Sequence, residues 1–254
     1  MNKYYTSRQN MKFKIIIIFI TTSILFLAGL TAFTIHSDAD DDTIISYTVD
    51  PAKQDIQLYW KNDQGEILKS IQNLKSFVES KNATLAFATN AGMYKEDNAP
   101  VGLFIQNGKT LMPLNTKNAS GNFYMKPNGV FYITKENKAT VCETDKFSNI
   151  GNVKFATQSG PMLLIDGQIH PSFAKGSANL NIRNGVGILP NNNIVFAMSK
   201  TEINFYDFAT YFQSLGCKNA LYLDGFVSRT YLPEKHWVQT DGNFGVMVAV
   251  IEKK

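Results

Sequence analysis

Residues 89–103 read TNAGMYKEDNAPVGL and follow directly on a strand-like apolar run, Leu85–Ala88. The strand pattern breaks at Asn90 and Gly92 and then continues. An amide and a glycine that interrupt a buried strand either turn the chain or aim a polar group at a ligand. We expect a β-strand over 84–89 and test the two interpretations of Asn90 against the rest of the chain.

Short apolar runs separated by tight-turn residues make up most of the remaining sequence. Asn107-Gly108, Asp166-Gly167 and the asparagines of 191–193 each stand between two such runs, which predicts β-hairpins. Further strands are expected on either side of Pro51 within 45–60, at 220–223 and at 244–252.

Two segments have helical periodicity. Apolar residues recur at helical spacing over 66–80, and a second helix is expected at about 205–215. Two or three helices with many strands, mostly joined by tight turns, predict an α+β domain with a mixed, largely antiparallel sheet.

The N-terminus has the features of a membrane anchor or a signal peptide. Residues 1–14 hold four basic and no acidic side chains, and the apolar run 15–35 is long enough to cross a bilayer. We favour an uncleaved anchor, with the acidic linker 36–43 and a domain at 44–254 outside the cytoplasm, periplasmic or at the cell surface. Secretion after signal cleavage is the alternative.

Charge and cysteine content limit the function classes. The formal net charge of +4 comes from residues 1–14, since removing their four basic residues from 25 leaves 21 against 21 acidic ones. The domain therefore shows no sign of nucleic-acid binding. Cys142 and Cys217 either form a disulfide or are two separately buried thiols. No H-E-x-x-H or C-x-x-C zinc motif is present. We expect that no metal or cofactor is required.

Four polar residues stand at the ends of apolar runs, each within two residues of a glycine: Asn90, Ser159, Arg183 and Asp224. Taken singly, each is typical of a turn. Arg183 and Asp224 are harder to explain in this way, because arginine beside an apolar strand needs a partner and Asp224 ends a strand that follows a helix. The two could also simply pair with each other.

The series NAGMY, QSGPML, IRNGVG and YLDG resembles the phosphodiester glycosidase family, in the right order over about residues 45–252. This is the family of N-acetylglucosamine-1-phosphodiester alpha-N-acetylglucosaminidase, and the chain more narrowly resembles its bacterial branch, formerly a domain of unknown function. Family members tend to have D-G-G-x-S where this chain has Asp224-Gly225-Phe226-Val227-Ser228, a departure that affects the expected substrate more than the fold.

The resemblance implies hydrolysis of a sugar-1-phosphodiester through an oxocarbenium-like transition state. Asp224 would be the nucleophile or the base that activates water, and Arg183 would hold the phosphate. Glu96 and Asp207 are the other candidate catalytic carboxylates, although Asp207 could equally be a favourable charge at a helix N-terminus. The candidate substrate-binding residues are Asn90, Gly92, Ser159, Gly160, Arg183, Gly225, Ser228 and Arg229.

The expected partners are a sugar-phosphate-containing glycan or glycolipid of the cell envelope and the membrane itself, through 15–35. A non-catalytic envelope module that binds anionic glycan is the alternative function. A Ca²⁺ ion held by Asp224 and backbone carbonyls is a further alternative, since oxygen ligands in glycine-rich turns suit hard cations.

Overall fold

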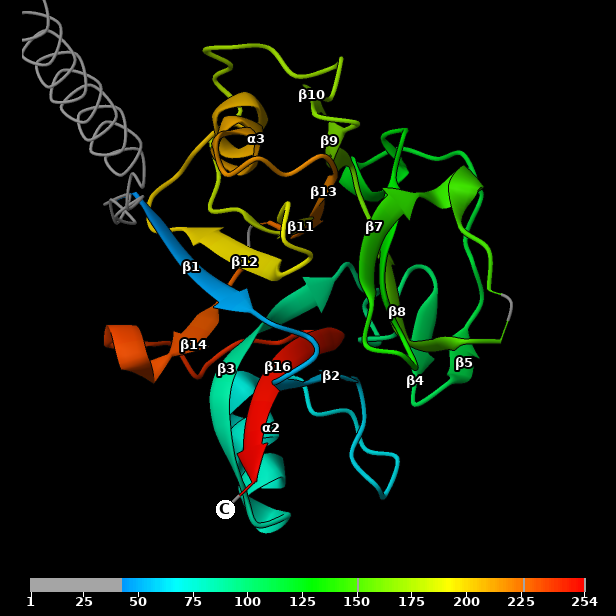
Figure 1. Cartoon of the computed structure of the whole chain (residues 1–254), viewed down its shortest axis with the longest axis vertical. Helices are drawn as coiled ribbons and strands as arrows, with labels where there is room; N and C mark the ends of the chain where they lie inside the picture. The colour runs from blue at the N-terminus through cyan, green and yellow to red at the C-terminus, as the bar shows by residue number, and fades with distance from the viewer. Residues whose placement is uncertain (1–42, 150, 226, 254) are drawn as a thin grey trace, which may run out of the picture. The chain divides into compact units, whose positions relative to one another are not determined.

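The computed structural model describes residues 43–149, 151–225 and 227–253 (Figure 1). All of them belong to one compact unit. Among them are two α-helices, α2 (Ile71–Ser80) and α3 (Phe205–Ser214), and sixteen β-strands. Short 3₁₀ turns lie at Asn122–Tyr124, Thr144–Lys146 and Pro233–Lys235.

The strands form three sheets in which every pairing among the described residues is antiparallel. The first sheet has the order β1-β12-β11-β13-β9-β10, with β1 (Ile44–Val49), β9 (Met162–Ile165), β10 (Gln168–Ile169), β11 (Asn184–Ile188), β12 (Ile194–Ser199) and β13 (Ala220–Asp224). The second has the order β15-β14-β3-β16-β2, with β2 (Asp55–Tyr59), β3 (Ala83–Gly92), β14 (Thr230–Leu232), β15 (Trp237–Val238) and β16 (Val246–Lys253). The third has the order β5-β4-β8-β6-β7, with β4 (Phe104–Gln106), β5 (Lys109–Met112), β6 (Gly129–Thr134), β7 (Ala139–Glu143) and β8 (Val153–Ser159).

The predicted α+β fold with one mixed sheet is wrong, because the described chain is mostly β. Tight turns can join only antiparallel neighbours, so a chain punctuated by hairpins builds antiparallel sheets and has no parallel crossovers. The two helices are ten residues long and do not form a layer between strands. Instead, α2 buries Ile71, Leu74 and Val78 against the second sheet, and α3 packs in a separate apolar cluster with the first sheet.

The predicted membrane or signal segment at 15–35 lies outside the described residues. Within the part of the chain that is described, no helix is both long and apolar enough to cross a bilayer.

Both predicted helices are confirmed, but the first begins five residues later than expected from 66–80. Ser70 caps it, accepting a hydrogen bond from the Asn73 backbone N–H at 3.1 Å. The preceding residue Lys69 has a left-handed φ of 64°, and Ile67 pairs with Lys61 in an isolated bridge. The apolar pattern of 66–80 therefore includes a turn at 66–69, which precedes the cap Ser70 and is not part of the helix.

The predicted hairpins are also confirmed. Asn107 and Gly108 have φ of 51° and 76°, and Asp166 and Gly167 have 49° and 84°. Positive φ at both central residues matches the twist of two antiparallel strands, and asparagine, aspartate and glycine tolerate it best.

One aromatic cluster joins all three sheets. Phe87 of β3 stacks on Tyr47 of β1 and on Phe196 of β12, with ring centroids 4.8 and 5.4 Å apart. Phe131 of β6 meets Phe196 edge-on at 5.8 Å. Truncating such a ring to alanine typically costs about 3–5 kcal/mol. The cluster thus holds β3 in a fixed place beside the first sheet.

The two cysteines are free thiols. Cys142 lies on β7, and Cys217 lies in the buried apolar cluster that contains α3. Burial raises the pKa of Cys142 to about 11 and that of Cys217 to about 12, so both are protonated at neutral pH. This agrees with the alternative of two separate thiols.

Candidate active site

Asp224 ends β13 opposite Asn184, the first residue of β11, at a register shift between the two strands. The backbone N–H of Asp224 donates to Asn184 Oδ1 at 2.9 Å, and the Asp224 carboxylate accepts from the Gly225 N–H at 2.7 Å. The bulge turns the end of β13 away from the regular ladder, as bulges beside active sites often do.

Asp224 lines a cleft with a volume of about 590 Å³. Lys95 and Glu96, which are both exposed, line the same cleft, together with Tyr94 and Tyr124. The cleft therefore combines two carboxylates, one cation and two phenol rings.

Desolvation raises the pKa of Asp224 to about 7, with the Gly225 N–H bond opposing part of the shift. The Asp224 charge also raises the pKa of two tyrosines. The pKa of Tyr94 is raised first by burial and then by the Asp224 charge, and burial likewise raises that of Tyr222, with Asp224 adding to it. A carboxyl that titrates near neutrality is suited to proton transfer.

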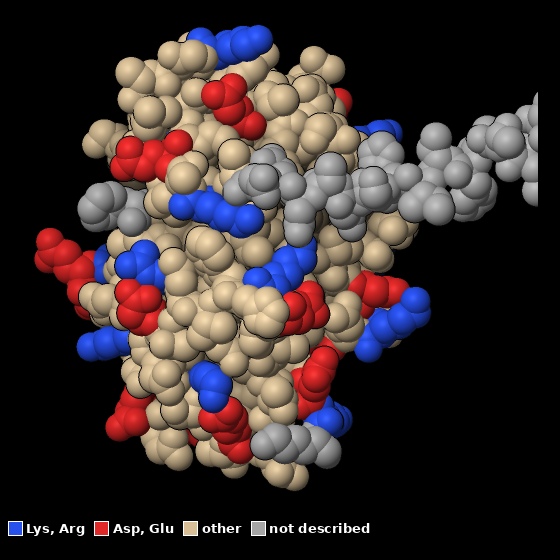
Figure 2. Space-filling model, turned by 90° about the vertical axis from the view of Figure 1, so that its left-hand side faces the viewer, with Lys and Arg blue, Asp and Glu red and all other residues tan. Residues whose placement is uncertain are grey.

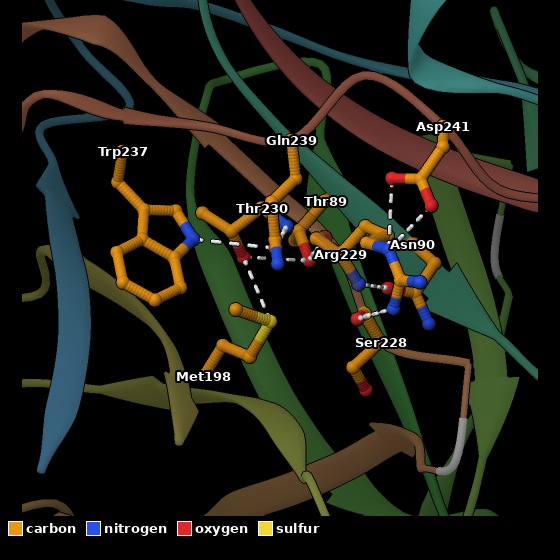
Figure 3. Close-up of polar contacts among 9 residues, drawn as sticks. All are labelled: Thr89, Asn90, Met198, Ser228, Arg229, Thr230, Trp237, Gln239 and Asp241. Atoms are coloured by element: carbon orange, nitrogen blue, oxygen red, sulfur yellow. Dashed lines mark hydrogen bonds and ion pairs between the residues drawn. The ribbon is translucent and has the colours of Figure 1, made fainter. Parts of the chain in front are cut away.

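Asn90 is fully buried near the end of β3. Its Oδ1 accepts from Asn184 Nδ2 at 3.2 Å. The same oxygen accepts from the Arg229 backbone N–H at 3.1 Å (Figure 3). Its Nδ2 is buried and has no hydrogen-bond partner among the described residues. The predicted polar break in the strand is thus a junction between β3, β11 and the segment before β14.

Arg183 lies outside the residues that line the cleft. It is 1% exposed, its guanidinium carbon sits 3.6 Å from the Phe205 ring centroid, and its Nε donates to the Ile203 carbonyl at 2.8 Å. Nη2 donates to the Asn179 carbonyl at 2.9 Å. No ion pair with Asp224 occurs in the described structure. Burial lowers the pKa of Arg183, and the Tyr222 phenol opposes this shift.

Ser159 and Gly160 lie at the end of β8, next to β13. Ser159 is fully buried and its Oγ donates to the Leu223 carbonyl at 2.5 Å. A Cβ on Gly160 would lie 2.6 Å from Asn128 Cβ. Ser159 thus bonds to the strand that carries Asp224, and Gly160 allows the backbone to lie close to Asn128.

The turn after Asp224 is held by Ser228, whose Oγ donates to the Gly225 carbonyl at 2.6 Å. A Cβ on Gly225 would lie 1.8 Å from the Tyr222 phenol oxygen, so any larger residue would require the buried Tyr222 ring or the turn to move. Arg229 points its guanidinium at Asp241, with Nε 2.8 Å from Oδ1 (Figure 3). Phe226, the departure from the family pattern, lies outside the described residues.

Asp207 and Gly92 have structural surroundings. The Asp207 N–H donates to Asn204 Oδ1 at 2.8 Å and its Oδ2 accepts from Asn204 Nδ2 at 2.7 Å, which caps α3. This favours the helix-terminus interpretation of Asp207, which is exposed and does not line the cleft. A Cβ on Gly92 would meet Thr157 Oγ1 at 2.8 Å.

No group of three or more histidine, cysteine, aspartate or glutamate side chains in the described ranges could hold a metal ion. The Ca²⁺ site at Asp224 would use backbone carbonyls and stays a prediction. Figure 2 shows basic and acidic side chains interspersed on the face that it presents, where no broad patch of one sign lies.

Sequence reasoning missed Asn184, Lys95 and Tyr94. Asn184 directly follows Arg183 in the IRNGVG motif, and an asparagine beside a glycine is typical of a turn. Alternation along β11 could have found it, because neighbours on a strand point to opposite faces. Lys95 and Tyr94 lie in the TNAGMYKEDNAPVGL stretch, where nothing distinguishes a cleft residue from a surface one.

Comparison with known proteins adds a family and a fold. A family model described as phosphodiester glycosidase matches residues 83–249. The uncharacterized protein YigE of Escherichia coli (strain K12) is 38% identical over 217 residues, which cover 82% of this chain and 84% of that protein.

Two solved structures are similar in fold. The catalytic domain of zebrafish N-acetylglucosamine-1-phosphodiester alpha-N-acetylglucosaminidase, auto-inhibited by its pro-peptide, superposes with a TM-score of 0.58 at 13% identity, over 84% of each chain. A putative exported protein from Burkholderia pseudomallei has a TM-score of 0.55 at 11% identity, over 82% of this chain and 73% of its own.

Proposed function

We propose that this chain, which belongs to the phosphodiester glycosidase family, hydrolyses the glycosidic bond of a sugar-1-phosphodiester in a glycan or glycolipid of the cell envelope. The observation that carries the proposal is the half-buried Asp224 carboxylate at the wall of a cleft that also holds Glu96 and Lys95.

Asp224 is the proposed nucleophile, or the base that takes a proton from the attacking water. Either role needs the ionised carboxylate beside the anomeric carbon, where positive charge develops in the transition state. A phosphate monoester is a good leaving group, so a strong general acid is not needed. Glu96, on the same cleft, is the second carboxylate that a glycosidase usually places across the bond.

Lys95 is the cation in the cleft that suits the phosphate. The resemblance assigned this role to Arg183, but two backbone carbonyls and the Phe205 ring already engage that guanidinium. An exposed lysine on the cleft can reach a phosphodiester as a point charge without giving up internal bonds. The geometry therefore supports Lys95 better than Arg183.

The proposed location is supported by the sequence of residues 1–42, whose pattern of basic residues, apolar run and acidic linker favours a domain outside the cytoplasm. Such a domain would meet phosphodiester-linked glycans or glycolipids at the membrane that anchors it.

Hydrolysis in ¹⁸O-labelled water tests the reaction type. The full chain is incubated with a panel of sugar-1-phosphodiesters, and the proposal expects free sugar that carries the label and an unlabelled phosphate monoester. Label in the phosphate would mean cleavage of the phosphorus–oxygen bond and would contradict glycosidase chemistry. Saturable binding of the panel with no release would favour the alternative of a non-catalytic glycan-binding module.

A further inference from the structure

The side-chain amide of Asn184 joins two sheets directly behind Asp224. Asn184 is fully buried at the start of β11 in the first sheet. Its Oδ1 accepts from the Asp224 backbone N–H, and its Nδ2 donates into the second sheet, to the Asn90 carbonyl at 2.7 Å and to Thr89 Oγ1 at 3.1 Å. One side chain thus bonds to the catalytic strand on one side and to β3 on the other.

The orientation of this amide is determined by its partners. Because the Asp224 N–H can only donate, the Asn184 atom that faces it must be the oxygen. The nitrogen then faces β3, where it also approaches Asn90 Oδ1 at 3.2 Å. That oxygen accepts the Arg229 N–H as well, so the Asn90 amide cannot be reversed either. The orientations of the Asn184 and Asn90 amides therefore follow from the backbone N–H groups of Asp224 and Arg229, respectively.

A further row of hydroxyl bonds continues from Thr89. Its Oγ1 donates to the Arg229 carbonyl at 2.8 Å, and Thr230 Oγ1 lies 3.3 Å away (Figure 3). This row ties β3 to the segment that follows Asp224 without touching Asp224 itself. It offers an internal comparison for the role of Asn184.

We propose that Asn184 is a positioning residue for catalysis, which holds the Asp224 backbone at the cleft wall and keeps a neutral donor–acceptor pair between Asp224 and Asn90. Asparagine is suited to this place because one atom must accept while the other donates. Aspartate keeps the acceptor but, when ionised, loses the donor and adds a second negative charge. The inference rests on the proposed function, in which the Asp224 carboxylate does the chemistry.

The charged and titratable groups that face Asp224 are few. Lys95 and Glu96 share its cleft, and the Tyr94 and Tyr222 phenols both respond to its charge. A carboxylate at position 184 would lie in direct hydrogen-bond contact with the Asp224 backbone N–H. Like charges disfavour ionisation, so it would raise the pKa of Asp224 further.

The test is a ¹³C carboxyl NMR titration of the full chain, with the Asp224 signal identified by its loss in Asp224→Asn. Asn184→Asp is expected to move the Asp224 midpoint up by about one pH unit or more, a size typical of neighbouring carboxylates. Thr89→Val is the matched control, because it removes buried hydroxyl bonds from the same network. It should lower the unfolding temperature and leave the Asp224 midpoint in place.

An unmoved midpoint in a folded Asn184→Asp protein would overturn the proposal, and so would an equal shift in Thr89→Val. If Asn184→Asp does not fold, Asn184→Ser replaces it. The shorter hydroxyl cannot span both partners, so water should enter and the midpoint should fall, whereas an unchanged midpoint would again contradict the proposal.

The titration needs no substrate, which separates the two proposals. A shifted midpoint in a chain that hydrolyses no substrate would contradict only the proposed function. Hydrolysis by the wild type combined with an unmoved midpoint would contradict only the role of Asn184. Where hydrolysis is measurable, the acid limb of kcat/KM should move with the NMR midpoint.

Discussion

The backbone N–H of Asp224 donates to the side-chain oxygen of Asn184 at 2.9 Å, across the register shift between β11 and β13. This bond lets β13 leave its ladder without an unpaired buried donor, which would otherwise cost about 1–3 kcal/mol. The carboxylate that follows then sits at the wall of the cleft, partly removed from water.

Asp224 should make the folded protein less stable as pH rises. Its folded pKa of about 7 lies above the ordinary 3.8, so between pH 4 and 7 the unfolded state loses its proton first and stability falls. Asp224→Asn should therefore be more stable than the wild type at pH 8, on the order of 4 kcal/mol. The difference should shrink towards pH 4 in chemical denaturation, and a pH-independent difference would contradict the raised pKa.

The pH dependence of catalysis should show the same group. If ionised Asp224 is the nucleophile or base, kcat/KM rises with pH through about 7 and levels off above it. Initial rates on a sugar-1-phosphodiester between pH 5 and 9 measure the limb. A rate that falls through 7 would instead make protonated Asp224 a general acid.

Lys95→Met should raise KM about tenfold, equivalent to about 1.4 kcal/mol, because it removes the cation that the cleft offers to the phosphate. The effect should weaken at high ionic strength. Lys53→Met is the matched control, since the Lys53 side chain is 81% exposed and pairs with Asp50. Equal KM values for both variants would exclude Lys95 as a phosphate ligand.

Arg183→Lys should destabilise the fold and leave KM nearly unchanged. Lysine cannot stack on Phe205 or reach the carbonyls of both Asn179 and Ile203, and each lost hydrogen bond of this buried cation costs about 1–3 kcal/mol. Thermal unfolding and steady-state kinetics measure the two effects. A normal unfolding temperature with a large rise in KM would restore Arg183 as the phosphate ligand.

Gly225→Ala should abolish activity, because the new Cβ would collide with the Tyr222 phenol oxygen at 1.8 Å and displace the turn after Asp224. Adding Tyr222→Phe removes that oxygen and should restore part of the activity. A double variant no better than Gly225→Ala alone would place the cause elsewhere in the turn.

Local patterns predicted the elements well. Asn107-Gly108 and Asp166-Gly167 formed hairpins because their backbone preferences are set by the residues themselves. The sheet arrangement was not predictable in the same way, since which strand pairs with which depends on distant contacts such as Phe87 with Tyr47 and Phe196.

The candidate site was predicted in part. Asp224 and Glu96 line one cleft, whereas Asp207 lies in the first turn of α3 and bonds to its cap Asn204, and Arg183 is enclosed by carbonyls and an aromatic ring. Sequence shows that a buried arginine needs a partner but does not show that backbone carbonyls will supply it. The role of Asn184 depends on a register shift, which no single segment encodes.

The most direct measurement compares phosphate monoester release from a sugar-1-phosphodiester by the wild type, Asp224→Asn and Asp207→Asn. Both substitutions remove one carboxylate, but only Asp224 lines the cleft. We predict that Asp224→Asn loses at least about a thousandfold in kcat, about 4 kcal/mol of transition-state stabilisation, while Asp207→Asn stays near the wild type. Wild-type rates in Asp224→Asn would contradict the account.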